Sequence, residues 1–432
     1  MLLTPVINIS GGSVIRSLDV YANICFIFFA LFLSVNKGVL QNRAIFIQVY
    51  GALALLFVQI IFLELIYGYG DTTGIAIVLR SCVTIFAAYG CVQLLIKKFN
   101  DGALPFFLKV VIIAAIIQGV VLWLTFFNSD FRDLMSQLFF RDLSVGKEHL
   151  VLLRTPGFVP TGGDGLSMNQ SLLAVVGLMG AYVYYPKSRF LFSLVGLLLF
   201  SIFSTMFSGQ SGFYLGVFFA SIIIATQKHY FQFTRKFLNI FIVSMVVITT
   251  IFLLAEQLGS YGQHLLDHYG YEHPLVRLLR GFIEMQSTGQ YFTPTGHALL
   301  TDMVIIPKDT IRFLVGNNDF GQLAGRSIAS DVGYFRMWHG LGLVGITLFL
   351  LPIFIFPLLR VRILLQKIKC HAANSDAYRI LVSEFRILLF VLIFGLIANY
   401  KIFYLSSRIF IFVFFVLLFL IYHKYRASRI RS

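Results

Sequence analysis

The chain has 432 residues, of which 58% are apolar and 12% are charged. A soluble globular domain carries about 25% charged residues, so the composition excludes that class and predicts an integral membrane protein. The net charge of +15 comes mainly from basic residues that collect in alternate loops, so it indicates membrane topology and contact with anionic lipids rather than nucleic-acid binding.

Eleven apolar segments match the length that an α-helix needs to cross about 30 Å of hydrocarbon, although the seventh is short. They are predicted at about 19–36, 44–67, 74–96, 103–126, 166–185, 190–207, 212–227, 237–256, 332–359, 385–400 and 406–423. Strand-like alternation is absent from these segments, so the predicted fold is an all-α polytopic bundle. The chain shows no internal repeat, and residues 1–432 are interpreted as one integral membrane domain.

The basic residues predict which loops face the cytoplasm. They lie in alternate short loops and in the C-terminal tail, at Lys37, Arg43, Lys97, Lys98, Lys187, Arg189, Lys228, Arg235, Lys236, residues 360–379 and residues 424–431. The positive-inside rule places these loops and the C-terminus in the cytoplasm, and eleven spans then place the N-terminus outside. The opposite side holds most acidic residues together with arginines, whose planar guanidinium groups suit phosphate, so we expect an anionic ligand there.

Two polar segments on the outer side interrupt the spans, at about 127–165 and 257–331. The second contains an amphipathic pattern at about 274–285, which predicts a helix that lies at the membrane interface or covers a cavity. His264 and His268 are spaced i, i+4 like zinc ligands, but a third ligand is not evident and a polar role is preferred. Nucleotide-binding motifs are also missing, so neither a metal nor another cofactor is predicted.

The segment 325–345, GRSIASDVGYFRMWHGLGLVG, closes the second outer loop and begins the ninth span. Asp331 begins the span, and Tyr334, Trp338 and His339 follow close to one helical face. Ionisable groups at this depth are costly and are therefore functional candidates. The alternative is that Asp331 caps a helix beginning one or two residues later, with the aromatic residues in the interfacial belt. The functional interpretation is preferred.

Four arginines on the predicted outer side are candidates for binding an anion: Arg80, Arg154, Arg326 and Arg408. For Arg80 and Arg408, pairing with Glu64 or Asp71 inside the protein is an equally good explanation. The SGQSG segment at 208–212 is interpreted as a small polar turn between two spans whose glycines permit unusual backbone conformations, not as a catalytic element.

Taken together, these features resemble the bacterial O-antigen polymerases, the Wzy-type members of the O-antigen ligase/polymerase superfamily. The spacing of Asp331, Tyr334, Gly342 and Gly345 matches the family pattern at the end of the long outer loop. Asp331 stands where the related ligases have histidine and Val332 stands where they have asparagine, which favours a polymerase. RTPGF at 154–158 resembles the family's Arg-x-x-Gly turn, whereas SGQSG lacks the arginine of the corresponding turn.

The resemblance implies a GT-C-like glycosyltransferase in the inner membrane with its active site facing the periplasm. Its partners would be undecaprenyl-diphosphate-linked oligosaccharides, as donor and as acceptor, and a polysaccharide chain-length regulator is a candidate partner. No metal would be needed.

The expected roles of the candidate residues follow from their chemistry. Asp331, or next His339, would take the acceptor's proton. The diphosphate would contact Arg80, Arg154, Arg326 and Arg408, and the sugar or acceptor would contact Tyr334, Arg336, Trp338 and Tyr404. An O-antigen ligase and a flippase or transporter of lipid-linked oligosaccharide remain the alternatives.

Overall fold

A computed structural model describes residues 24–27, 43–68, 71–139, 163–186, 189–227, 255–270, 273–288, 303–321, 332–372 and 376–431. These residues form helices without any strand, as the composition predicts. Within them, six helical segments are long and apolar enough to cross a membrane. One of these, Thr73–Phe127, covers two of the predicted spans, whereas most of the predicted spans at 19–36 and 237–256 lies outside the described residues.

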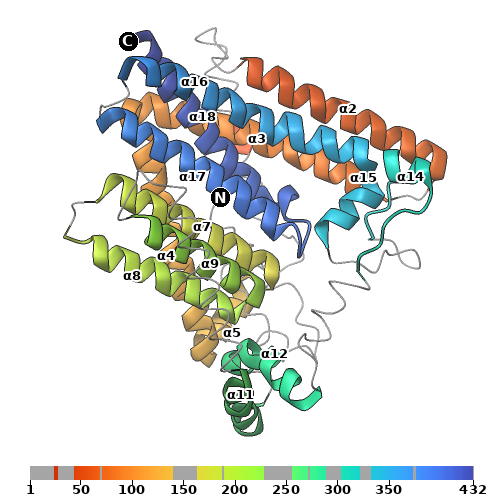
Figure 1. The fold of residues 1–432 in the computed structure, drawn as a ribbon, viewed down its shortest axis with the longest axis vertical. Coiled ribbons are helices and arrows are strands. Elements are labelled where there is room, and N and C mark those ends of the chain that lie inside the picture. Colours follow the sequence, from red (N-terminus) through yellow and green to blue (C-terminus); the bar gives the residue numbers. More distant parts are fainter. Residues whose placement is uncertain are drawn as a thin grey trace. The chain divides into compact units, whose positions relative to one another are not determined.

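The chain divides into two compact units. The first comprises Met1–Leu2, Ser17–Val110 and Asp302–Ser432, and the second comprises Leu3–Arg16 and Val111–Thr301. The described helices of the first unit (Figure 1) are α2 (Arg43–Tyr67), α3 (Thr73–Phe99), η1 (Asn100–Gly102), the start of α4 (Ala103–Phe127), α14 (Thr310–Val315), α15 (Gly333–Leu350), the π-helix η3 (Leu351–Ile355), α16 (Phe356–Ala372), α17 (Asp376–Ala398), η4 (Tyr404–Ser406) and α18 (Arg408–Arg431).

Helix α18 forms the core of the first unit. Residues 410–421 are apolar on every face and all of them are buried, as expected for a helix enclosed by its neighbours. Its rings pack against α2 and η3: Phe419 stacks on Phe46 at 5.4 Å, and Phe414 meets Phe354 at 5.3 Å. Helix α2 instead leaves one apolar face exposed, including Leu55 and Leu65, which is the pattern of a helix in contact with lipid.

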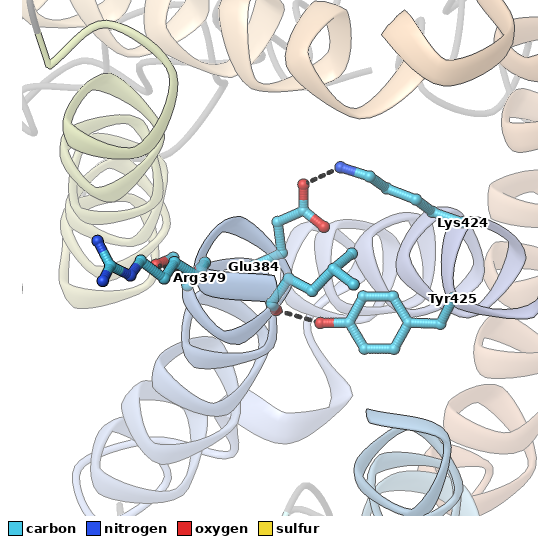
Figure 2. A network of polar contacts seen from close by, with 6 residues as sticks. Arg379, Glu384, Lys424 and Tyr425 are labelled. Carbon is cyan, nitrogen blue, oxygen red and sulfur yellow. Dashed lines mark hydrogen bonds and ion pairs between the residues drawn. The ribbon is translucent and has the colours of Figure 1, made fainter. Parts of the chain in front are cut away.

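A polar network joins α17 to α18 inside this apolar unit (Figure 2). The fully buried Glu384 pairs with Lys424 through an Oε1–Nζ distance of 2.5 Å. The hydroxyl of Tyr425 donates to the backbone carbonyl of Leu381, which lies one helical turn before Glu384 in α17. A buried carboxylate is tolerated when a cation compensates its charge, so the pair fixes how these two helices pack. Glu384 and Lys424 both lie close in sequence to basic segments, residues 360–379 and 424–431, that are predicted to face the cytoplasm.

The described helices of the second unit are the rest of α4, α5 (Ser129–Phe139), α7 (Asp164–Tyr184), α8 (Leu191–Ser204), η2 (Thr205–Phe207), α9 (Gln210–Gln227), α11 (Ala255–Tyr269) and α12 (Pro274–Thr288). Helices α7 and α9 approach closely at Gly212, which has no side chain. A Cβ at this position would lie only 2.2 Å from the carbonyl carbon of Ser167. The hydroxyl of Ser171 donates to the carbonyl of Gly212 at 2.6 Å. Gly212, the last residue of the SGQSG segment, therefore permits close contact between the two helix backbones.

The predicted amphipathic helix is α12, and it forms a hairpin with α11 (Figure 1). Leu265 of α11 packs with Val276, Leu279 and Ile283 of α12 in a small buried core. The apolar face of α12 is thus covered by α11, whereas the sequence alone suggested that it covers a cavity or faces the membrane interface.

Candidate functional site

Helix α15 is broken at Gly342, nine residues after its start. Gly342 has φ 63° and ψ −178°, a conformation that favours glycine. A Cβ at this position would lie 2.3 Å from the backbone nitrogen of Gly316, and a Cβ at Gly316 would lie 2.5 Å from the nitrogen of Gly342. The break exists because two glycine backbones, 26 residues apart in sequence, lie against each other. The sequence places Gly342 in the family pattern, but it does not predict the break.

The backbone carbonyls before the break find partners elsewhere in the first unit. The carbonyls of His339 and Gly340 accept from the backbone nitrogens of Asn317 and Asn318, at 2.8 and 3.1 Å. The side-chain amide of Gln59 donates to the carbonyls of Leu341 and Val315, each at 2.8 Å. Irregular backbone at membrane depth is tolerated only where its polar groups are satisfied, and here α2 and residues 315–318 satisfy them.

Residues 316–321, GNNDFG, form a turn that is held on its other side by acidic residues of α2 and the α2–α3 connection; we call it the GNNDFG turn. Asp71 is 3% exposed and accepts from the backbone nitrogens of Phe320 and Thr73, at 3.0 and 2.9 Å. Glu64 accepts from the side-chain amide of Asn318 at 2.8 Å. The carboxylates of Glu64 and Asp71 therefore take part in holding this turn.

Two of the predicted residues at the start of α15 contact opposite neighbours. The Nε of Arg336 donates to the carbonyl of Phe320 in the GNNDFG turn at 3.0 Å. The hydroxyl of Tyr334 donates to the carbonyl of Leu396 in α17 at 2.6 Å. Both side chains are half-buried, so they link α15 to its neighbours while part of each remains accessible.

The other two contact the segment before the GNNDFG turn. The indole nitrogen of Trp338 donates to the carbonyl of Phe313 at 3.1 Å, and the two rings lie 4.8 Å apart. The Nε2 of His339 lies 2.9 Å from the carbonyl of Ile305. A carbonyl can only accept, so this contact requires the proton on Nε2 and leaves Nδ1 as the acceptor of a neutral ring.

The first residue of helix α15, Gly333, lies against the connection between α17 and α18. A Cβ at Gly333 would lie only 2.5 Å from the carbonyl oxygens of Asn399 and Ile402. Tyr404 in this connection is 1% exposed, and burial raises the pKa of its hydroxyl well above the usual value. Its ring packs between aromatic neighbours of α17 and α18, so neither face is open to a sugar in this conformation.

Two of the predicted arginines lie in the described part of the first unit. Arg408 is the first residue of α18 and is half-buried, and Arg80 is an exposed residue near the start of α3. The start of α3 lies against the GNNDFG turn at Gly74, and the start of α15 lies against the α17–α18 connection at Gly333, so these four elements meet at one end of the first unit.

Three predicted site residues, Arg154, Arg326 and Asp331, lie outside the described residues. Helix α15 begins at Gly333, as expected, and its N-cap residue is Val332, without a side-chain cap. Because Asp331 is not among the described residues, the alternative that it caps this helix also stays a prediction. The role of Asp331 in chemistry stays a prediction.

Sequence reasoning did not single out Gln59, Asn317, Asn318 and Asp319. The Gly and Asn residues of the GNNDFG turn are a signal for a tight turn, and both Gly316 and Asn318 have positive φ. Gln59 was also detectable as an isolated amide in an apolar span.

Within the described part of the chain, no group of three or more His, Cys, Asp or Glu residues is placed to hold a metal ion. The side chains at the start of α15 can instead offer guanidinium donors, an imidazole and aromatic rings to a ligand. No protein-family model matches the chain, and no curated protein and no solved structure is significantly similar to it.

Proposed function

We propose that this chain is an O-antigen polymerase of the Wzy type, a GT-C-like membrane glycosyltransferase that extends lipid-linked glycans. The broken helix α15, with the GNNDFG turn packed on it, is the observation that carries the proposal. Arg336, Trp338 and His339 lie there among largely apolar helices. Polar and ionisable groups are costly in a membrane, and such places are functional sites by default.

Arginine chemistry supports a diphosphate donor. The contact of Arg336 with Phe320 uses Nε alone, so its two Nη groups can face a ligand. A guanidinium group binds phosphate oxygens in a bidentate manner and stabilises charge that develops on a departing diphosphate. Arg80 and Arg408 lie in the same unit, and Arg154 and Arg326 are proposed to add to this set. The reaction would then need no metal ion.

In the proposed reaction, a hydroxyl oxygen of the acceptor attacks C1 of the donor's sugar. The bond from C1 to the diphosphate oxygen breaks, and the diphosphate leaves on its polyprenyl chain. Asp331 takes the hydroxyl proton, and Nδ1 of His339 is the second candidate. Tyr334 and Trp338 would contact the sugars. The donor is an undecaprenyl-diphosphate-linked glycan, the acceptor is a lipid-linked repeat unit, and the site faces the periplasm.

Deleting the gene in its own bacterium tests this function against its alternatives. Attaching one repeat unit to the lipid core does not need polymerisation, so the deletion strain should make lipopolysaccharide that carries a single unit, visible on a gel. A plasmid copy should restore the ladder of long chains. Lipopolysaccharide without any repeat unit would point to a ligase or a flippase instead, and an unchanged ladder would reject all three functions.

A further inference from the structure

A continuous row of four rings runs along the α11–α12 hairpin of the second unit, and we call it the ring row (His264, His268, Tyr269 and His273). His264 and His268 stack with centroids 5.5 Å apart and planes 11° apart. Tyr269 meets His268 edge-on at 5.7 Å and stacks on His273 at 4.8 Å. The first three side chains are exposed, Tyr269 by 59%, and His273 is half-buried. The row thus leaves part of its ring surface open to the surroundings.

The described side chains of the hairpin do not form the broad apolar face of a helix that lies in a membrane interface. Its apolar side chains are used in the core between α11 and α12. Among the described side chains of residues 255–288, the exposed large hydrophobic ones are two tyrosines, Tyr261 and Tyr269, without an exposed aliphatic residue. Helices that lie in a membrane interface instead bury a broad apolar face in the lipid.

The ring row does not have the geometry of a metal site either. The rings of His264 and His268 are nearly parallel, so their nitrogens do not converge on one point. The described residues contain no group of three or more potential metal ligands. Partial burial also lowers the pKa of His273, so this ring is neutral near pH 7 and does not attract an anion.

Hydrogen-bonding groups accompany the rings on the hairpin. Asp267 directly precedes His268 and accepts from the side-chain amide of Gln263 at 3.0 Å. Gln286 of α12 donates to the hydroxyl of Ser260 of α11 at 2.9 Å. Flat ring faces next to imidazole nitrogens, amides and carboxylates suit a ligand that has apolar C–H faces and many hydroxyl groups. Carbohydrate has this chemistry.

We propose that the ring row binds the glycan chain, with sugar faces stacked on Tyr269 and His268. The proposal rests on the proposed function, because it takes the polysaccharide as the molecule present beside this loop. It adds a second contact for the glycan, in the second unit, that does not take part in bond formation.

The test measures how tightly the full-length protein in detergent binds a polysaccharide. The polysaccharide is released by mild acid from the bacterium that encodes this chain. Tyr269→Leu removes the ring and keeps apolar volume, and it should weaken binding by about tenfold. Tyr269→Phe keeps the ring and should bind like the wild type. Ser287→Ala, an exposed change near the C-terminal end of α12 and outside the ring row, is the matched control and should also leave binding unchanged.

Equal binding by Tyr269→Leu and the wild type, or no binding by either, would overturn the ring row as a glycan site. Loss of binding to vesicles of anionic lipid in Tyr269→Leu, with glycan binding intact, would overturn it in favour of a membrane contact. Chain elongation by the wild type is measured separately, so a failed ring row leaves the proposed function standing. Conversely, absent elongation would reject the function even if the glycan binds.

Discussion

Asp331→Asn should reduce the lipopolysaccharide ladder to a single repeat unit when the variant replaces the wild type in the deletion strain. The amide has nearly the same size as the carboxylate but cannot take the acceptor's proton. Loss of a general base slows a reaction by about 100-fold or more, which is enough to remove long chains. The measurement is a silver-stained gel of lipopolysaccharide, with an immunoblot of membranes to show equal amounts of inserted protein.

Asp309→Asn is the matched control for this variant. Asp309 lies in the same predicted outer segment, and its carboxylate caps α14 by accepting from the backbone nitrogen of Ile311 at 3.1 Å. Asparagine caps a helix about as well as aspartate, so this variant should keep the full ladder. A full ladder from Asp331→Asn would remove Asp331 as the base and leave His339 as the next residue to change.

Gly342→Ala should disrupt both stability and chain elongation. A side chain at φ 63° costs about 1–2 kcal/mol, and the added Cβ would also lie 2.4 Å from the carbonyl carbon of Val315. Because its nearest neighbours are backbone atoms, a rotamer change cannot relieve the contact. We expect the free energy of unfolding to fall by more than about 3 kcal/mol. Thermal unfolding of the purified protein, followed by tryptophan fluorescence, measures this loss.

Gly51→Ala provides the comparison within the same unit. Gly51 lies in the middle of α2, and a Cβ there meets nothing within 4 Å. Alanine is favoured over glycine in a helix by about 0.5–1 kcal/mol, so this variant should be as stable as the wild type or slightly more stable. If Gly342→Ala unfolds at the same temperature as Gly51→Ala, the break in α15 is not a required feature of the fold.

The helices were predictable because each depends on its own residues. The spans predicted at 44–67 and 74–96 correspond to α2 and α3 almost residue for residue, since length and apolarity decide a membrane helix locally. The ninth span was predicted to end near residue 359, whereas the helical segment continues through η3 and α16 to Ala372. Basic side chains such as Arg360 and Arg362 do not end a helix, although they end an apolar run.

The arrangement at the start of α15 was not predictable, because it depends on contacts between distant residues. Gln59 reaches carbonyls that are 256 and 282 residues away in sequence, and Asp71 holds a backbone nitrogen 249 residues away. Periodicity and composition carry no information about such pairs. The sequence did identify Arg336, Trp338 and His339, because polar groups inside an apolar segment stand out without knowledge of their partners.

The most direct test of the central claim is to incubate the purified wild-type protein in detergent micelles with the undecaprenyl-diphosphate-linked repeat unit and to follow glycan length by mass spectrometry. Micelles have no two sides, so transport cannot contribute to the result. The proposed polymerase should produce lipid-linked glycans of two or more repeat units and release undecaprenyl diphosphate in equal measure to the bonds formed. A protein that is folded and binds the substrate but leaves every glycan at one repeat unit would contradict the proposed function.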